Sequence, residues 1–337
     1  MTLFATIFGC SGLALNEAER AFFREAKPWG FILFKRNVDD PSQVRALCAE
    51  LRESVGYDAP ILIDQEGGRV QRLREPHWPT YPPGRAYANP ALPMELRERA
   101  ARLGARLIAR DLAALGVDVD CLPVLDVPVT GAHDVIGDRA YGDDPTIVAR
   151  LGRAAAQGLL DEGVLPVAKH IPGHGRAGVD SHLALPVVDA SREELERRDF
   201  APFRELADLP LAMTAHVVYT AIDPEHCATH SRRVIADVIR GHIGFDGLLM
   251  SDDVGMQALA GDFAERTRTL FSAGCDLALH CSGVMEEMIA VASEARPLSA
   301  AAERRSRSAL GLRNRGETDF DPVDARAELD ALLAARA

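Results

Sequence analysis

Five apolar runs in the sequence end in ionisable side chains of the types that enzymes use. The groups at these ends are Asp64, Asp126, Lys169 with His170, His216, and Asp252. Loops that only connect structural elements usually carry Gly, Ser and Asn at such places. We therefore expect the five ends to meet in one active site.

Asp252 follows the apolar run Gly247–Ser251, which would carry its carboxylate to the end of a strand. A carboxylate at that place can attack an electrophile or stabilise a cation, and we expect one of these roles for Asp252. Asp253 should point to the other side if the strand continues. The alternative for both carboxylates is to cap the next helix, and this is what we expect of Asp253.

The segment from Lys169 to His182, KHIPGHGRAGVDSH, combines three histidines with an aspartate and three glycines. Its glycines predict a loop rather than a helix. Asp180 and His182 are two residues apart, so their side chains share a face if the segment is extended. An aspartate can hold a histidine nitrogen and raise its basicity, and such a histidine can give a proton in one step and take one in the next.

A zinc site is the alternative for this segment, because His170, His174, Asp180 and His182 are all possible metal ligands. The spacing of His170 and His174 suits two ligands on one helix. Pro172 and Gly173 lie between them and disfavour a helix there. We therefore expect no metal.

A further group of residues combines one carboxylate with several cationic or imidazole donors. Its members are Asp64, Arg72, Arg139, Lys169 and His170. Such a group is typical of sites that bind vicinal sugar hydroxyls or a carboxylate. A surface ion pair is the alternative for any one arginine, and we expect it for Arg69 and Arg74.

Three other polar residues have less specific expectations. His216 either lines the pocket or makes a buried hydrogen bond. Asp126 and Asp138 are expected to orient loops or arginines.

Eight short apolar runs, each followed by an amphipathic segment, would position these residues. The expected strands are 3–8, 30–34, 60–63, 117–125, 165–169, 209–215, 247–251 and 275–280, and the expected helices are 15–26, 41–55, 93–115, 144–162, 191–206, 231–242, 255–273 and 283–296. This alternation predicts an α/β fold, a closed (β/α)8 TIM-like barrel, with closing helices at 303–312 and 322–335 and a turn at 316–321. An open doubly wound sheet is the alternative, but no glycine-rich dinucleotide turn follows the first strand.

The composition is that of a globular enzyme, and we expect residues 1–337 to form a single domain. Of the 337 residues, 50 are acidic and 38 are basic, so the formal net charge is −12. This balance argues against nucleic acid or an anionic membrane as a partner. The six cysteines form no paired motif, and neither a signal peptide nor a membrane span is recognisable, so we expect a cytoplasmic protein.

Four motifs in this order resemble the family 3 glycoside hydrolases: ILIDQEGGRVQRL, IGDRAYGDDP, KHIPGHGRAGVDSHLALPVV and GLLMSDDVGMQAL. The resemblance covers nearly the whole chain. It implies a retaining exo-β-N-acetylglucosaminidase (a β-N-acetylhexosaminidase) that removes the non-reducing terminal β-1,4-linked N-acetylglucosamine (GlcNAc) from peptidoglycan fragments in cell-wall recycling. One such fragment is GlcNAc-1,6-anhydro-N-acetylmuramic acid, with or without its peptide. It also implies a monomer without metal or organic cofactor, with a saccharide as its only partner.

The resemblance also implies roles for individual residues. Asp252 would be the nucleophile that forms a covalent glycosyl-enzyme, and His182 would be the acid/base, assisted by Asp180. The sugar would be bound by Asp64, Arg72, Arg139, Lys169 and His170. Within the family, a β-glucosidase or a glycoside phosphorylase is the nearest alternative, and outside it a metal-dependent hydrolase or a sugar-binding barrel.

Overall fold

Eight parallel strands close into a barrel in the computed structural model, which describes residues 2–181, 184–313 and 320–335. Around the barrel the strands are β1 (Phe4–Phe8), β2 (Pro28–Leu33), β3 (Ile61–Ile63), β6 (Val119–Asp120), β7 (Leu165–Ile171), β9 (Leu211–Thr214), β12 (Leu248–Asp253) and β13 (Leu277–His280). Strand β13 pairs with β1 and completes the ring. The predicted barrel is therefore confirmed, with one strand in each of the eight expected places.

The strands are apolar along nearly their whole length because the barrel buries both of their faces, one in its interior and one under helices. The strand expected at 117–125 is much shorter, since only Val119 and Asp120 belong to β6. Pro123 interrupts it because proline has no backbone N–H to donate to a neighbouring strand. Beyond it, Val124 makes an isolated bridge to Lys169.

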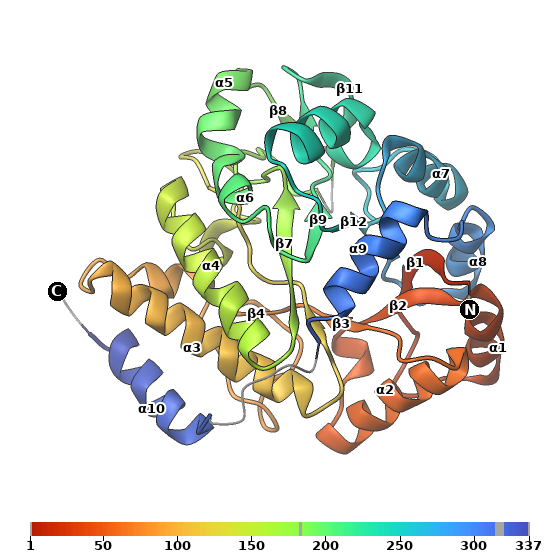
Figure 1. Cartoon of the computed structure of the whole chain (residues 1–337), viewed down its shortest axis with the longest axis horizontal. Helices are drawn as coiled ribbons and strands as arrows, with labels where there is room; N and C mark the ends of the chain where they lie inside the picture. Colours follow the sequence, from red (N-terminus) through yellow and green to blue (C-terminus); the bar gives the residue numbers. More distant parts are fainter. Residues whose placement is uncertain (1, 182–183, 314–319, 336–337) are drawn as a thin grey trace.

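Helices surround the barrel (Figure 1). They are α1 (Glu17–Ala26), α2 (Pro41–Val55), α3 (Met94–Ala113), α4 (Pro145–Asp161), α5 (Arg192–Glu194), α6 (Ala201–Glu205), α7 (Phe263–Ala273), α8 (Met285–Ser293), α9 (Ala300–Leu310) and α10 (Pro322–Leu333). The shorter helical segments are η1 (Lys35–Asn37), η2 (Gly84–Ala88), η3 (Gly137–Arg139), η4 (Leu195–Asp199), η5 (Ala228–His230) and η6 (Val234–His242), of which η4 and η6 are π-helical.

Two of the expected helices differ from the prediction. The helix expected at 191–206 is divided into α5, η4 and α6. The helix expected to begin at residue 255 begins at Phe263, because the Asp262 side chain accepts a hydrogen bond from the backbone N–H of Glu265 and caps it there. Most of the turn expected at 316–321 lies outside the described residues.

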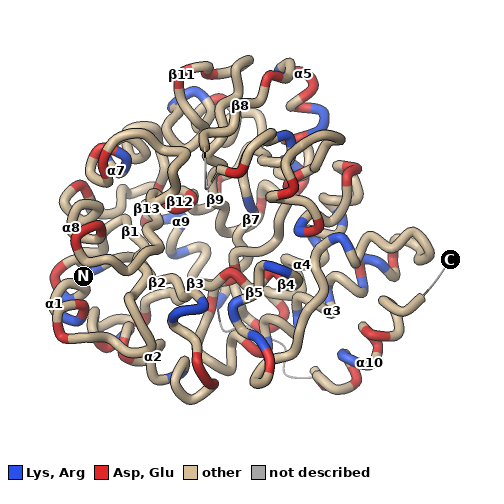
Figure 2. The backbone as a smooth tube through the Cα atoms, turned by 180° about the vertical axis from the view of Figure 1, so that it is seen from behind, with Lys and Arg blue, Asp and Glu red and all other residues tan. Residues whose placement is uncertain are grey.

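Small strands outside the barrel extend the loops at its carboxyl end. Strands β4 (Gln65–Gly67) and β5 (Val70–Gln71) form a hairpin directly after β3, and β8 (Val187–Val188), β10 (Val218–Tyr219) and β11 (Asp223–Cys227) form a second sheet. Figure 2 views the molecule from this side and shows acidic and basic segments beside one another around β3, β4 and β5.

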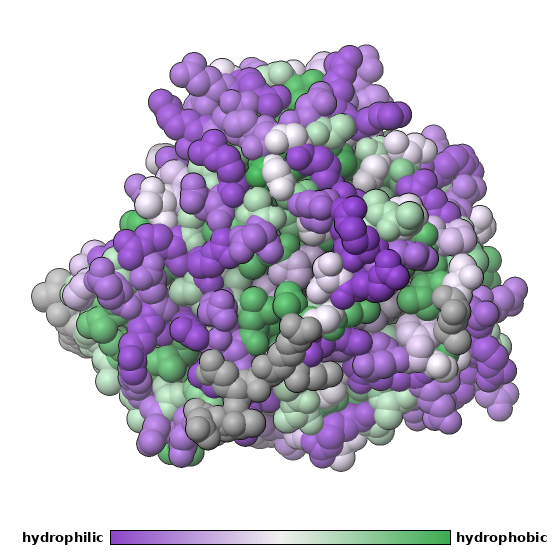
Figure 3. All heavy atoms as spheres, in the orientation of Figure 1, coloured by the Kyte–Doolittle hydropathy of each residue, from purple (hydrophilic) through white to green (hydrophobic). Residues whose placement is uncertain are grey.

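The opposite end of the barrel is closed by α9. The indole N–H of Trp29, in β2, donates a hydrogen bond to Ser306 Oγ at 2.7 Å. Arg305 pairs with Asp276, which stands immediately before β13. On this face hydrophilic residues predominate, with apolar residues in small groups between them (Figure 3). The strand carboxyl ends are thus the end of the barrel left available for a site.

None of the helices in the described ranges is long and apolar enough to span a lipid bilayer.

Helices α3 and α4 pack closely at Gly158, and this contact generates a first prediction. A Cβ atom at Gly158 would lie 2.3 Å from the backbone oxygen of Arg102. We expect Gly158→Ala to lower the free energy of unfolding by about 1–3 kcal/mol despite the better helix propensity of alanine. Urea denaturation measures the change. Gly12→Ala is the control, because a Cβ atom there would have nothing within 4 Å. Equal stability of the two variants would contradict the close packing.

Candidate active site

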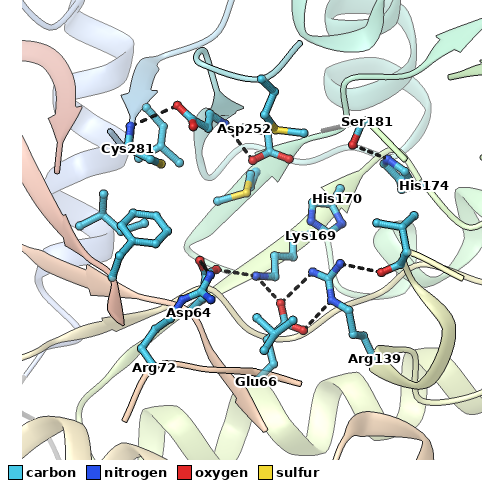
Figure 4. A pocket seen from close by; sticks show the side chains of 18 of the residues that line it. Asp64, Glu66, Arg72, Arg139, Lys169, His170, His174, Ser181, Asp252 and Cys281 are labelled. Carbon is cyan, nitrogen blue, oxygen red and sulfur yellow. Dashed lines mark hydrogen bonds and ion pairs between the residues drawn. The ribbon is translucent and has the colours of Figure 1, made fainter. Parts of the chain in front are cut away.

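A cavity of about 480 Å³ opens at the carboxyl ends of the barrel strands. Six of the residues expected at the site line it: Asp64, Arg72, Arg139, Lys169, His170 and Asp252 (Figure 4). They come from segments far apart in the sequence, as expected for strand ends that meet in a closed barrel. Asp180 precedes Ser181, which also lines the cavity, whereas His182 lies outside the described residues.

Lys169 is the centre of a chain of charges on the cavity floor. Its Nζ lies 2.8 Å from Asp64 Oδ1 and 2.6 Å from Glu66 Oε1, and the side chain is only 2% exposed. Asp64 Oδ2 is also 2.9 Å from Arg72 Nη2. Glu66 accepts two hydrogen bonds of 2.8 Å from Arg139. The order is therefore cation, anion, cation, anion, cation.

These partners keep the buried groups charged. Burial by itself would raise the pKa of Asp64, but the charges of Lys169 and Arg72 outweigh it and hold that pKa well below its usual range. For Glu66, Arg139 and Lys169 outweigh burial in the same way and lower the pKa to about 2. Burial would lower the pKa of Lys169, but the two carboxylates raise it above its usual value. Asp64, Glu66 and Lys169 therefore stay ionised near neutral pH.

Glu66 is a member of the site that the sequence reasoning did not identify. It lines the cavity and is buried. The signal was present, because Glu66 is two residues from Asp64 and side chains two apart share a face of an extended segment. Gln65 between them binds the hairpin, since its Oε1 accepts the backbone N–H groups of Arg72 and Leu73.

The turn between β4 and β5 brings Arg72 back over Asp64. Gly67 and Gly68 have φ values of 91° and 57°, which glycine adopts readily. A Cβ atom at Gly67 would also lie 2.3 Å from the backbone oxygen of Pro82. Glycine is thus required at this turn on grounds of both conformation and space.

Two other arginines beside this turn, Arg69 and Arg74, are not part of the cavity lining. Arg69 pairs with Asp134 and Asp138 at the surface, as expected, and this is the role of Asp138 as well. The ion pair expected of Arg74 is not formed within the described residues. Its guanidinium donates instead to the backbone oxygens of Gln71 and Arg69.

Asp126 orients His170. The Asp126 carboxylate is fully buried, and its Oδ2 lies 2.7 Å from His170 Nδ1. Its Oδ1 accepts the backbone N–H groups of His170, at 3.2 Å, and of His174, at 2.6 Å. Because Nδ1 of His170 is engaged, Nε2 is the ring nitrogen left to act toward the cavity. The orienting role expected of Asp126 is therefore confirmed.

His174 anchors the loop that leads to Asp180. Its Nε2 lies 3.1 Å from Ser181 Oγ. Burial, together with the nearby His170, lowers the pKa of His174 to about 4, so the ring is neutral near pH 7. Asp180 itself is half-buried. Within the described residues, no three His, Cys, Asp or Glu side chains are grouped so as to hold a metal ion.

Asp252 and Asp253 make different contacts, although both border the cavity. The backbone N–H of Asp253 donates to Asp252 Oδ1 at 2.8 Å. Asp253 Oδ1 accepts the backbone N–H groups of Gly255, at 2.9 Å, and of Cys281, at 3.1 Å. The helix cap expected of Asp253 is therefore wrong, because α7 begins only at Phe263 and is capped by Asp262, nine residues after Asp253.

His216 makes a buried hydrogen bond, which was one of its two expected roles. Its ring is fully buried, with Nδ1 2.7 Å from Thr229 Oγ1 and Nε2 3.0 Å from the backbone oxygen of Asp253. Burial lowers its pKa, so the ring is neutral near pH 7.

Apolar side chains also line the cavity. They are Phe34, Val70, Ile136, Met213 and Met256. The guanidinium groups of Arg36 and Arg72 lie 5.1 Å and 5.2 Å from the centre of the Phe34 ring. A floor of fixed charges, a carboxylate and an apolar wall together suit a sugar, whose hydroxyls need polar partners and whose ring faces are apolar.

The buried pairing of Glu66 yields a prediction on stability. We expect Glu66→Gln to lower the free energy of unfolding by about 3 kcal/mol at pH 7, because it leaves buried cations short of a partner. The pKa of Glu66 is about 2 in the folded chain, against an ordinary 4.5. Between these two pH values the unfolded chain binds a proton at Glu66 that the folded chain does not bind. The difference between the two proteins should therefore shrink as pH falls from about 5 toward 3.

Urea denaturation at several pH values tests this prediction. Glu98→Gln is the matched control, because Glu98 pairs with Arg150 at the surface, where such pairs contribute at most about 1 kcal/mol. A difference between the wild type and Glu66→Gln that stays constant from pH 7 to pH 3 would contradict the expected ionisation.

Known proteins of one family are similar to this chain. Residues 8–308 match the model of the glycosyl hydrolase family 3 N-terminal domain. A β-hexosaminidase of Alkalilimnicola ehrlichii is 42% identical over 287 residues, which are 84% of this chain and 82% of that protein. A β-hexosaminidase of Pseudomonas aeruginosa is 37% identical over 329 residues, which are 97% of this chain and 96% of that protein. The crystal structure of NagZ from Neisseria gonorrhoeae in complex with N-trifluoroacetyl-D-glucosamine is similar with a TM-score of 0.88 and 30% identity, over 99% of each chain.

Proposed function

The chain belongs to glycosyl hydrolase family 3, as a glycoside hydrolase of the β-N-acetylhexosaminidase type, and we propose that it is a retaining exo-enzyme acting on peptidoglycan fragments. It removes the non-reducing terminal β-1,4-linked GlcNAc, for example from GlcNAc-1,6-anhydro-N-acetylmuramic acid with or without its peptide. The enzyme thereby serves cell-wall recycling in the cytoplasm.

One observation carries this proposal: the Asp252 carboxylate and the five-charge chain around Lys169 line the same cavity. The chain presents donors and acceptors whose positions are fixed before substrate arrives. Such preorganised groups bind and orient hydroxyls with little reorganisation. The sugar unit would then lie against Asp64, Arg72, Arg139, Lys169 and His170, with its anomeric carbon near Asp252.

In the first chemical step, Asp252 attacks the anomeric carbon and forms a covalent glycosyl-enzyme. His182 donates a proton to the departing sugar oxygen and becomes neutral. In the second step, neutral His182 takes a proton from water, which attacks the anomeric carbon and releases Asp252. Two inversions retain the configuration. Asp180 assists by holding the imidazole of His182.

The comparison with a solved complex supports the identity of the sugar. That structure holds N-trifluoroacetyl-D-glucosamine, which carries a 2-acylamino group as GlcNAc does. A β-glucosidase would instead favour an unsubstituted hydroxyl at that carbon. We therefore propose selectivity for the acetylated sugar.

The nucleophile assignment predicts that Asp252→Ala lowers kcat at least ~10⁴-fold on p-nitrophenyl β-N-acetylglucosaminide, because no covalent intermediate can form. Release of nitrophenol measures this, with the β-glucoside as a second substrate and with a chelator present. Asp138→Ala is the control, since Asp138 pairs with Arg69 at the surface. Near-normal turnover by Asp252→Ala would reject the nucleophile, and preference for the glucoside would reject the substrate.

The acid/base assignment predicts an effect that depends on the leaving group. His182→Ala should slow cleavage of the natural disaccharide by about 10²–10⁴-fold, because its leaving oxygen needs a proton. Glycosides with acidic phenols need little protonation, so their first step should lose much less. Burst kinetics separates the two steps. Equal losses for all leaving groups would count against the acid role.

A further inference from the structure

We propose that Asp253 is a positioning residue for the reaction, which fixes the direction of the Asp252 carboxylate from the ends of two neighbouring strands. This inference rests on the proposed function, because it gives Asp253 a role only if Asp252 is the nucleophile. The three strands concerned, β9, β12 and β13, are adjacent in the barrel.

The contact between the two residues is made by the backbone. The N–H of Asp253 donates to Asp252 Oδ1 at 2.8 Å. A backbone N–H is a rigid donor, so the direction of the carboxylate depends on how firmly the peptide of Asp253 is held. This makes the attachments of Asp253 relevant to chemistry at Asp252.

The side chain of Asp253 attaches this backbone to β13 and to its own turn. Oδ1 accepts the N–H of Cys281, the residue that follows β13, at 3.1 Å. The same oxygen accepts the N–H of Gly255 at 2.9 Å. Figure 4 shows the bond to Cys281 beside Asp252. Replacement of the Asp253 side chain by alanine would remove both hydrogen bonds.

The main chain of Asp253 is held from the β9 side. His216 follows β9, and its Nε2 donates to the backbone oxygen of Asp253 at 3.0 Å. Because Nε2 carries the proton of the neutral ring, Nδ1 accepts a hydrogen bond from Thr229 Oγ1 at 2.7 Å. His216 is therefore fixed at both nitrogens, and with it the peptide that follows Asp253.

A buried histidine, His280, lies beside the Asp253 carboxylate. His280 Nδ1 lies 3.8 Å from Asp253 Oδ1, and its Nε2 is 2.9 Å from Ser282 Oγ. Ser282 donates to Glu287 at 2.5 Å. His280 is therefore a close neighbour of the Asp253 carboxylate. Precise positioning has a kinetic consequence, because a displacement of about 1 Å of a reacting group can cost about 10²-fold in rate.

Two substitutions of Asp253 separate position from charge. Asp253→Ala removes the acceptor, and we expect kcat to fall about 100-fold with KM within about threefold of the wild-type value. Asp253→Asn retains an oxygen that can accept from Gly255 and Cys281, and we expect its kcat within about fivefold of wild type. The substrate is p-nitrophenyl β-N-acetylglucosaminide.

Asp262→Ala is the matched control. It also removes a carboxylate that accepts a backbone N–H, nine residues further along and outside the cavity lining. Comparable thermal stability of the Asp253→Ala and Asp262→Ala variants, with loss of kcat only in the first, would support the positioning role. A kcat of Asp253→Ala within threefold of wild type would overturn it. So would an Asp253→Asn variant as slow as Asp253→Ala, because charge rather than position would then matter.

His216→Asn loosens the main chain of Asp253 from the β9 side, and it decides the question if Asp253→Ala does not fold. The shorter side chain cannot reach the backbone oxygen of Asp253, and we expect kcat to fall at least tenfold with KM little changed. An unchanged kcat in a folded His216→Asn variant would reject the positioning role.

Covalent labelling with a fluorinated N-acetylglucosaminyl fluoride separates failure of this inference from failure of the proposed function. We expect mass spectrometry to locate the sugar on Asp252 in the wild type, and labelling to be about 100-fold slower in Asp253→Ala. Labelling at Asp252 with an unchanged rate in the variant would reject only the positioning role. Labelling of another residue would reject the nucleophile and the role of Asp253 together.

Discussion

The buried ammonium group of Lys169 is the interaction on which the floor of the cavity depends. A cation that leaves water must gain partners at close range, and Lys169 has Asp64 at 2.8 Å and Glu66 at 2.6 Å. Each carboxylate then also holds an arginine, so that one buried cation organises five charges. The glycine turn after Glu66 serves this arrangement, because it brings Arg72 back to Asp64.

The two ends of the barrel use the same kind of ion pair for different purposes. At the amino end, Arg305 and Arg240 neutralise Asp276 beneath the closing helix α9, where the pairs contribute to stability. At the carboxyl end, similar pairs border an open cavity and remain in reach of a ligand. The parallel barrel separates the two roles because all of its strands point the same way.

At the carboxyl end of the barrel, where the cavity lies, two proposed roles are also separated. The charge chain around Lys169 is proposed to bind and orient the sugar, whereas Asp252, at the end of β12, is the group proposed to react. Hydrogen bonds from β9 and β13 meet at Asp253, next to that carboxylate. The two proposed roles, binding of the sugar and alignment of the nucleophile, thus fall to different strands of one barrel.

The sequence by itself determined the eight strands, because strands buried on both faces must be apolar along their length, and it determined which residue types stand at their ends. It did not determine the partners of those residues. Lys169 meets Asp64 across 105 positions of the chain, and only closure of the barrel brings them together. Glu66 was overlooked and Asp253 was assigned a helix cap because their contacts come from distant strands and from where α7 begins. Local pattern decides which face a side chain takes, whereas tertiary structure decides what it meets there, since a hydrogen bond forms only within about 3 Å.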